Sequence, residues 1–164
     1  MHKLEHIDRP IRVCFPFIGN NVGGSHISAL MLAKHLDRNR VEPVIVLHEE
    51  GPLSDYIRAQ GLSYELIAIP HFFEEPFHSW RNAASLLIQT FRLTKFILHR
   101  QINIVHTNDA RIHYGWPLAT KLARARLIWH QRTGTFGRSR VKLRFARLAS
   151  QVRNAAATLT SCFA

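Results

Sequence analysis

The stretch "FIGNNVGGSHISALMLAKHL", residues 17–36, places three glycines between an apolar run and a helical pattern. The run before it, "IRVCFPFI" at 11–18, is too continuously apolar for a half-exposed strand and is typical of a strand buried on both faces of a parallel sheet. After the loop, Ser25 is a suitable N-cap for a helix ending near Leu36. The glycines either allow a tight turn or let a ligand approach the backbone, and the sequence leaves both interpretations open.

The same alternation of strand and helix continues along the chain. Further strands are expected at 43–48, 63–70, 102–107, 126–131 and 157–164, and helices at 51–61, 81–100, 113–124 and 138–153. This order predicts an α/β fold, with a doubly wound, largely parallel Rossmann-like sheet of about six strands. Residues 1–10 are expected to be an N-terminal tail and residues 11–164 one domain.

Sheets of this kind bind ligands beyond the carboxyl ends of their strands. The segments expected there are Gly19–Ser25, His48–Glu50, His106–Asp109 and His130–Gly134. The glycine loop has neither the spacing of a dinucleotide fingerprint nor the lysine of a Walker loop. It still leads backbone N–H groups into a helix N-terminus, which favours a phosphate or a sugar hydroxyl.

The net charge of +11 lies entirely in the last third of the chain. Residues 1–109 hold eleven basic and eleven acidic residues, whereas eleven basic residues and no acidic one follow Asp109. Such a field attracts phosphates on nucleic acid, on anionic lipid or on a small ligand. The basic helix expected at 138–153 favours an anionic membrane surface. The helix expected at 81–100 adds basic residues near apolar ones, namely Arg92, Lys95 and Arg100 near Phe91, Phe96 and Leu98. A nucleic-acid-binding module is an alternative, but only Phe145 offers an aromatic ring within that helix, which weighs against nucleic acid as a partner.

Location and metal content follow from simpler features. No apolar run reaches the ~18 residues of a membrane-spanning helix, and the N-terminus lacks the apolar segment of a secretory signal. We therefore expect a cytoplasmic protein, with peripheral binding to the inner face of the membrane as the further possibility. Cys14 and Cys162 have no Cys or His nearby at ligand spacing, so no metal site is expected.

Four segments resemble, in order and spacing, the N-terminal domain of family 4 glycosyltransferases. They are "GNNVGGSHISALMLAKHL", "GPLSDYIRAQG", "INIVHTND" and "LIWHQRTG", and the resemblance covers nearly all of residues 11–164. It implies half of a GT-B architecture, in which two Rossmann-like domains face each other across a cleft. It also implies retaining transfer of a sugar from a nucleotide-sugar to a glycan or lipid-linked acceptor, with the donor as co-substrate and no further cofactor or metal.

The resemblance also implies a set of site residues. His130 is the expected catalytic residue, because an imidazole at the end of the fifth strand can donate to a sugar hydroxyl or to charge developing in the transition state. The expected substrate-binding residues are Gly19, Gly23, Gly24, Ser25, Asn108, Asp109 and Arg132. Among them, the glycine loop would face the donor diphosphate and the acceptor, Asn108 and Asp109 the acceptor hydroxyls, and Arg132 an anionic group. The sequence departs from the family pattern at Ser25–His26 and at Asn108, which leaves the acceptor open.

The donor-binding half of the architecture is expected to be absent. In the family, a C-terminal domain with a Glu-x7-Glu motif holds the nucleotide, and here no acidic residue follows Asp109. The chain is therefore expected to be inactive alone, with a separate subunit carrying that domain as a partner. Two alternatives stay open, a non-catalytic interaction subunit and a remnant of a split transferase, and whether the chain is an enzyme is undecided.

Overall fold

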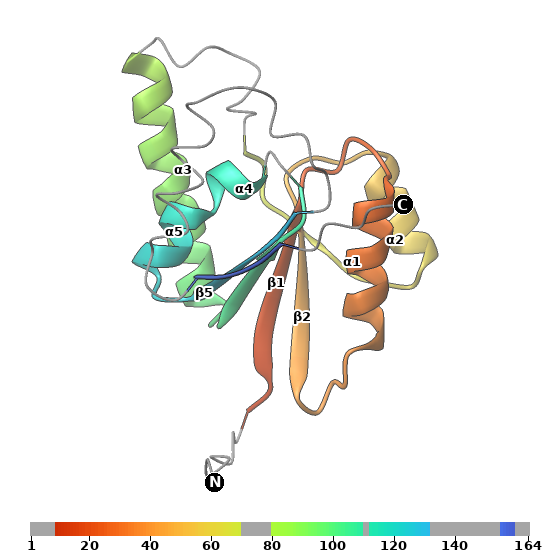
Figure 1. Ribbon diagram of the computed structural model, residues 1–164. Helices are drawn as coiled ribbons and strands as arrows, with labels where there is room; N and C mark the ends of the chain where they lie inside the picture. The colour runs from red at the N-terminus through yellow and green to blue at the C-terminus, as the bar shows by residue number, and fades with distance from the viewer. Residues whose placement is uncertain (1–8, 70–79, 110–111, 132–154, 160–164) are drawn as a thin grey trace, which may run out of the picture.

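The computed structural model describes residues 9–69, 80–109, 112–131 and 155–159. Its centre is one parallel sheet in the order β3-β2-β1-β4-β5-β6. The strands are β1 (Ile11–Phe17), β2 (Val41–Leu47), β3 (Glu65–Leu66), β4 (Ile104–Thr107), β5 (Arg126–Gln131) and β6 (Ala155–Leu159). The helices are α1 (Gly24–His35), α2 (Pro52–Ala59), α3 (Trp80–His99), α4 (Ile112–Gly115) and α5 (Pro117–Leu122). The predicted α/β class and its parallel sheet are confirmed (Figure 1).

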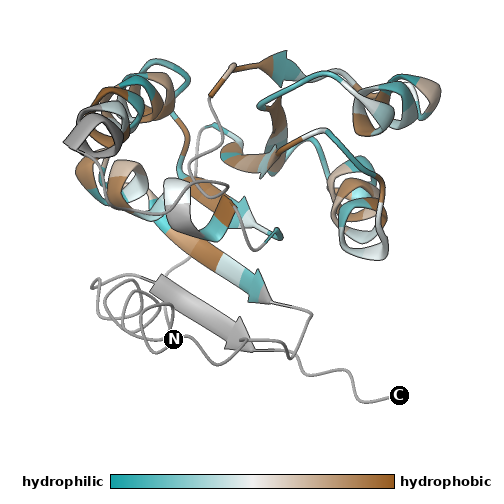
Figure 2. Cartoon of the chain, turned by 90° about the horizontal axis from the view of Figure 1, so that it is seen from above, coloured by the Kyte–Doolittle hydropathy of each residue, from teal (hydrophilic) through white to brown (hydrophobic). Residues whose placement is uncertain are grey.

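Helices cover both faces of this sheet. In Figure 1, α1 and α2 lie on one side of the strands and α3, α4 and α5 on the other, and Figure 2 shows the two layers from above. Along β1, Phe15 and Phe17 belong to the core under α1 and α2, whereas Cys14 belongs to the core under α3 and α5. Successive side chains of a strand point to opposite faces, so the apolar residues that follow Arg12 in β1 supply both cores.

The winding of the chain reverses at β1. The chain moves outward from β1 through β2 to β3, and then returns to move outward in the other direction through β4 and β5. The carboxyl ends of β1 and β4 therefore define a topological switch point, where open α/β sheets bind ligands. The glycine loop follows β1, and Asn108 and Asp109 follow β4.

The strand predicted at 63–70 is wrong in length, because the structure has only Glu65–Leu66 as β3. The N–H of Ile67 still donates to the carbonyl of Leu47 at 2.8 Å, which continues the pairing by one step. β3 lies at the edge of the sheet, where a short strand exposes few unpaired backbone groups to a second chain.

The helix predicted at 113–124 is two helices, and Pro117 explains the break. Proline has no N–H to donate, and its ring collides with the carbonyl four residues earlier, so it begins α5 instead of continuing α4. The prediction of Ser25 as an N-cap is also wrong. α1 begins at Gly24 with Gly23 in extended conformation as its N-cap, and Ser25 lies in the first turn.

Several predictions concern residues outside the described ranges. The basic helix expected at 138–153 and the site residue Arg132 lie there entirely, as do residues 1–8 of the expected tail and 160–164 of the last expected strand. Within the part of the chain that is described, no helix combines the length and apolarity needed to cross a membrane.

Candidate functional site

The start of α1 touches the end of β4 at the switch point. His26 places its Nε2 atom 3.5 Å from Oδ2 of Asp109. The side-chain amide of Asn108 donates to the backbone carbonyl of Ser25 at 3.4 Å. His26 and Asn108 are both buried. The structure thus brings together Ser25, Asn108 and Asp109, which the sequence named, and adds His26, which it did not name as a site residue.

His26 also fixes the conformation of the glycine loop. The backbone N–H of Gly23 donates to Nδ1 of His26 at 3.1 Å, so the proton of the neutral ring is on Nε2, the atom that faces Asp109. The ring packs edge-on against Phe17, with centroids 5.7 Å apart. The sequence does carry a signal for this contact. His26 stands three residues after Gly23, and from that position a side chain can reach back to the backbone of the N-cap residue.

The three glycines of the loop have different reasons to be glycine. Gly19 has a φ of +120°, and a Cβ there would lie 2.0 Å from the carbonyl oxygen of Glu49, so the fold itself requires glycine. A Cβ at Gly23 would make only an ordinary contact, 3.7 Å from Nδ1 of His26, and one at Gly24 would meet no described residue within 4 Å. Within the described part of the chain, neither conformation nor packing explains Gly24, which lies at an exposed helix start with open space above it.

His130 lies at the same end of the sheet as the glycine loop. Its ring centroid is 5.6 Å from that of His106 in β4, which in turn packs edge-on against Phe15 at 5.2 Å. Phe15 faces the core under α1 and α2, so the two imidazoles lie on the α1 side of the sheet. The imidazole of His26 lies against Phe17, and His106 packs on Phe15 with His130 beside it, so all three imidazoles lie at this end of the sheet on its α1 side.

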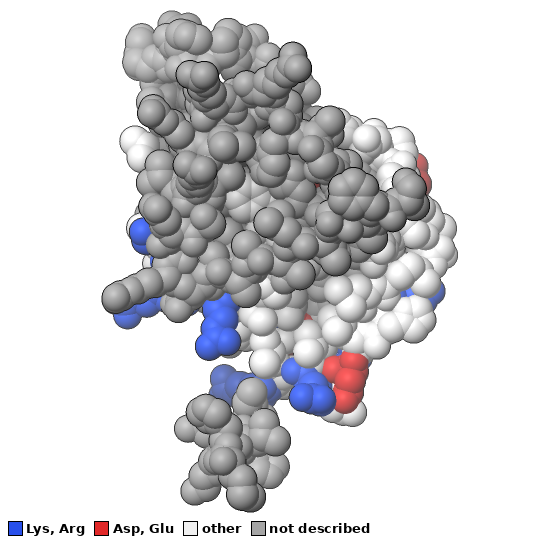
Figure 3. All heavy atoms as spheres, in the orientation of Figure 1, with Lys and Arg blue, Asp and Glu red and all other residues white. Residues whose placement is uncertain are grey.

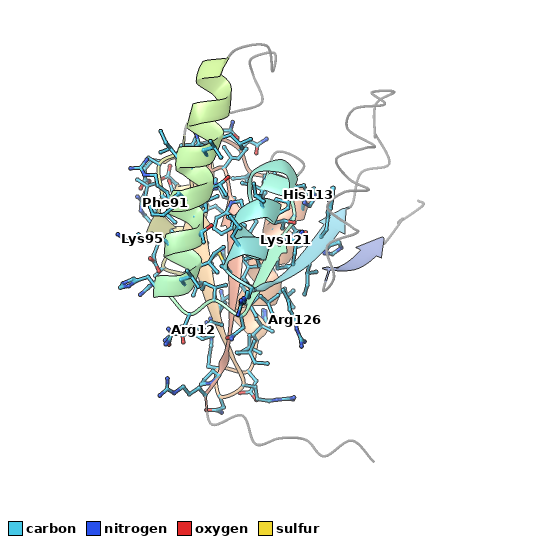
Figure 4. The ribbon with its side chains drawn as sticks, turned by 90° about the vertical axis from the view of Figure 1, so that its left-hand side faces the viewer. Arg12, Phe91, Lys95, His113, Lys121 and Arg126 are labelled. Atoms are coloured by element: carbon cyan, nitrogen blue, oxygen red, sulfur yellow. The ribbon has the colours of Figure 1, made fainter. Side chains whose placement is uncertain are left out.

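His113 of α4, labelled in Figure 4, lies on the other face of the sheet. Its Nδ1 is 2.7 Å from the hydroxyl oxygen of Thr107, and its ring is 4.6 Å from that of Trp129. Burial lowers the pKa of His113 to about 3, with further lowering by His106 and His130 and an opposing effect of Asp109. His113 is therefore neutral at physiological pH and acts as a fixed hydrogen-bonding group under the site.

His48, which follows β2, is part of the core. The indole N–H of Trp116 donates to Nε2 of His48 at 3.0 Å, so the other nitrogen carries the proton and donates to the carbonyl of Ile67 at 2.9 Å. Both ring nitrogens of His48 therefore form hydrogen bonds, and these hold the start of α5 and the segment after β3 against β2. The side chain has a structural role and leaves the switch point to the residues of β1 and β4.

Glu50 is bound on the surface near α2. The hydroxyl of Tyr64 donates to its carboxylate at 2.8 Å, which together with Arg58 holds the pKa of Glu50 below its usual value. Glu42 and Glu50 happen to have Glu-x7-Glu spacing, but Glu42 pairs with Arg12 at the opposite end of β2. The two glutamates therefore do not form a common binding site.

The described residues of this site offer three kinds of hydrogen-bonding group. They are the backbone N–H groups at the start of α1, the side-chain amide of Asn108 and the imidazole rings. Within those residues no group of three His, Cys, Asp or Glu side chains could hold a metal ion. The N–H groups of the first turn of α1 have no carbonyl partner inside the helix and carry the positive end of its dipole. Such a set suits a ligand with anionic oxygens and hydroxyl groups.

This fold is that of the Rossmann-like domains found in GT-B proteins, and several solved structures share it. The first is MurG of Acinetobacter baumannii, at 16% identity and a TM-score of 0.63, with 94% of this chain and 43% of that chain covered. HepE of Anabaena in complex with UDP and glucose follows at 15% and 0.62, covering 85% and 35%. A UDP-N-acetylglucosamine 2-epimerase follows at 12% and 0.57, covering 88% and 40%. The chain thus spans less than half the length of each of them.

The family model of Glycosyltransferase Family 4 matches residues 22–162. The chain belongs to this family, as the four sequence segments indicated. No curated protein sequence matches it. The structural neighbours include a HepE with bound UDP and glucose and an epimerase, so the fold alone does not select a reaction.

Proposed function

We propose that residues 11–164 form the acceptor-side domain of a retaining glycosyltransferase. The domain would take part in moving a sugar from a nucleotide-sugar to a glycan or lipid-linked acceptor. In the transfer, the bond between the anomeric carbon and the diphosphate oxygen breaks, and a bond to the acceptor hydroxyl oxygen forms. The acceptor proton leaves with the nucleoside diphosphate, so no metal, oxidant or reductant is consumed.

One observation supports this proposal most strongly, namely the open position above Gly24. A glycine with no conformational or packing requirement at an exposed helix start is explained if a ligand occupies that space. The N–H groups of Gly24 and Ser25 would then bind the donor diphosphate or an acceptor oxygen, aided by the helix dipole. The epimerase among the neighbours and the UDP bound to HepE are consistent with a nucleotide-sugar as the ligand class.

The other site residues have roles that fit their positions. His130, on the α1 side of β5, would donate a hydrogen bond to a sugar hydroxyl or to the departing charge. Asn108 and Asp109 would orient acceptor hydroxyls, with Asp109 held in place by His26. For Arg132, two residues beyond His130 in the sequence and outside the described residues, the resemblance to the family suggests binding to the anionic part of the donor. These groups position and stabilise reacting atoms, which is where most of a transferase's rate enhancement arises.

The domain would need a donor-binding domain to complete the cleft, either in a longer chain or in a partner subunit. The nucleotide would be held mainly on that second domain, so we expect negligible turnover by the 164-residue chain alone. A lipid-linked acceptor would place the protein at the cytoplasmic surface of an anionic membrane. An anionic membrane surface is therefore one of the partners in this proposal.

Two measurements on the purified chain test it. Saturation-transfer NMR with UDP-glucose should show transfer to the ligand, and His130→Ala should reduce it, while the matched His35→Ala change on exposed α1 should not. No saturation transfer at millimolar ligand, or equal loss in both variants, would contradict the site. Hydrolysis or transfer of UDP-glucose by the chain alone would contradict the expected need for a second domain.

A further inference from the structure

The outer side of α3 exposes large apolar side chains. They are Leu87, Ile88, Phe91 and Leu98, which are 68, 61, 71 and 57% exposed. At about 100° per residue, Leu87, Phe91 and Leu98 fall within about 40° of one another around the helix. A second side of α3, about 120° away around the helix, is also apolar, with Leu93 and Ile97 in the core. A helix that needs only one buried face therefore carries a second apolar face toward solvent.

Basic residues border this surface, which we call the α3 outer face and define as the four exposed apolar residues with Arg92 and Lys95. Figure 4 shows Phe91 and Lys95 directed away from the sheet. Neither Arg92 nor Lys95 forms an ion pair with a described residue, whereas Arg100 at the end of the helix is paired with Glu65. Two cations thus stand beside the apolar side chains without a described carboxylate to neutralise them.

The charge of the whole helix layer has one sign. No acidic residue occurs between positions 80 and 108 or between 112 and 131, and Lys121 of neighbouring α5 adds a further exposed cation. In Figure 3 the charged side chains visible at the edge formed by α3 and α5 are blue. Among the described acidic residues, Glu65 is paired with Arg100 just after α3, whereas Asp37 and Asp55 lie in the α1 and α2 layer. The apolar surface therefore lies in a positive field.

We propose that the α3 outer face docks on an anionic lipid surface. Leu87, Phe91 and Leu98 would enter the boundary between headgroups and acyl chains, as the apolar face of an interfacial helix does. Arg92 and Lys95 would extend along that surface to the lipid phosphates. The proposal rests on the proposed function in that it identifies which face meets the membrane, and it does not use the helix expected at 138–153.

Charge complementarity selects lipid over other occupants. A second copy of the chain on this face would bring the cations of both copies together, with no acidic residue on α3 to offset them. A nucleic acid would gain little from Leu87, Ile88 and Leu98, since unpaired bases stack on aromatic rings. The face also lies on the opposite helix layer from α1, so lipid bound there leaves the glycine loop accessible (Figure 1).

Vesicle co-sedimentation of the full chain, without nucleotide-sugar, tests the proposal. The chain should bind vesicles of phosphatidylcholine with phosphatidylglycerol, bind pure phosphatidylcholine much less, and lose binding as salt is raised. The double change Leu87→Glu and Phe91→Glu should lower the partition coefficient more than about tenfold, since added charges are repelled and apolar contact is lost. The matched control, Met31→Glu with Leu32→Glu, adds the same charge to exposed positions of α1 and should lower it only slightly.

A second variant keeps the apolar side chains and removes the cations. Arg92→Gln with Lys95→Gln should weaken binding about 25-fold, at about fivefold for each basic residue near the surface. Circular dichroism shows whether each variant is folded. Unchanged binding of both double variants, an equal loss in the α1 control, or a dimer that the α3 changes dissociate would overturn the proposal. Binding of UDP-glucose to the chain is measured without vesicles. A failure of the proposed function is therefore distinguished from a failure of membrane docking.

Discussion

Replacing Gly19 and Gly24 separately by alanine distinguishes the glycine that the fold needs from the glycine that a ligand needs. At Gly19 the residue has a φ of +120°, which costs a non-glycine residue about 1–3 kcal/mol. The new Cβ would also lie 2.0 Å from the carbonyl oxygen of Glu49, so the loops after β1 and β2 must separate. Separation breaks the hydrogen bonds from Glu49 N–H to Ile18 and from Leu53 N–H to Gly19, each contributing about 1 kcal/mol.

The sum for Gly19→Ala is a loss of about 3–5 kcal/mol, a large part of a typical free energy of unfolding. For a domain of this size the Tm should fall by roughly 10 °C. Gly24→Ala places a methyl group in open space at the first position of α1, so stability should be unchanged or higher by up to about 1 kcal/mol.

Urea and thermal unfolding followed by circular dichroism measure both variants beside the unmodified chain. A stable Gly19→Ala protein would refute the close approach of the two loops. A Gly24→Ala protein destabilised by more than about 2 kcal/mol would show that the fold requires this glycine, contrary to an alanine being accommodated in a helix start. In that case the open space above Gly24 would no longer support a ligand.

Three further changes test the contacts beneath the site by urea unfolding. His26→Ala removes the acceptor for Gly23 N–H and the contact with Asp109, and should cost about 1–3 kcal/mol; no loss would show that the loop does not depend on this ring. Trp116→Phe leaves Nε2 of buried His48 without its donor and should cost about 1–3 kcal/mol, against no more than about 0.5 kcal/mol for the exposed control Leu122→Ala. His113 has a folded pKa of about 3, so below pH 6.5 the unfolded chain binds a proton that the folded chain does not, and stability falls as pH drops through the window from 6.5 to 3. At pH 5.5 this group should account for about 1.4 kcal/mol of the loss, and His113→Gln should flatten the dependence between pH 7.5 and 5.5 by that amount; an unchanged slope would contradict the buried neutral ring.

The sequence predicted the framework of the site because the framework depends on local patterns. The continuous apolar run of β1 indicated burial on two faces, and the strand order that follows from alternating elements placed Gly24, Asn108 and His130 at one end of the sheet. Pro117 was a further local signal, and a helix drawn through it was predicted incorrectly.

The specific contacts could not be predicted, because they join residues far apart in the chain. His26 meets Asp109 across 83 positions, and Trp116 meets His48 across 68, and no periodicity reports such a pair. The difference between Gly19 and Gly24 also needed coordinates, since it depends on what a Cβ would touch. The exposed apolar side of α3 also needed coordinates, since the sequence does not show which apolar residues the core buries.

The most direct test of the central claim is a titration of the ¹⁵N-labelled chain with UDP-glucose, observed at the backbone amides of α1. The account predicts concentration-dependent shifts at Gly24 and Ser25, with smaller shifts at Asn108 and His130 and none at Gly61, and it predicts that Gly24→Ala removes them without unfolding the chain. Saturating ligand that leaves the Gly24 amide unchanged, or that shifts it equally in the folded Gly24→Ala variant, would contradict a ligand bound at the start of this helix.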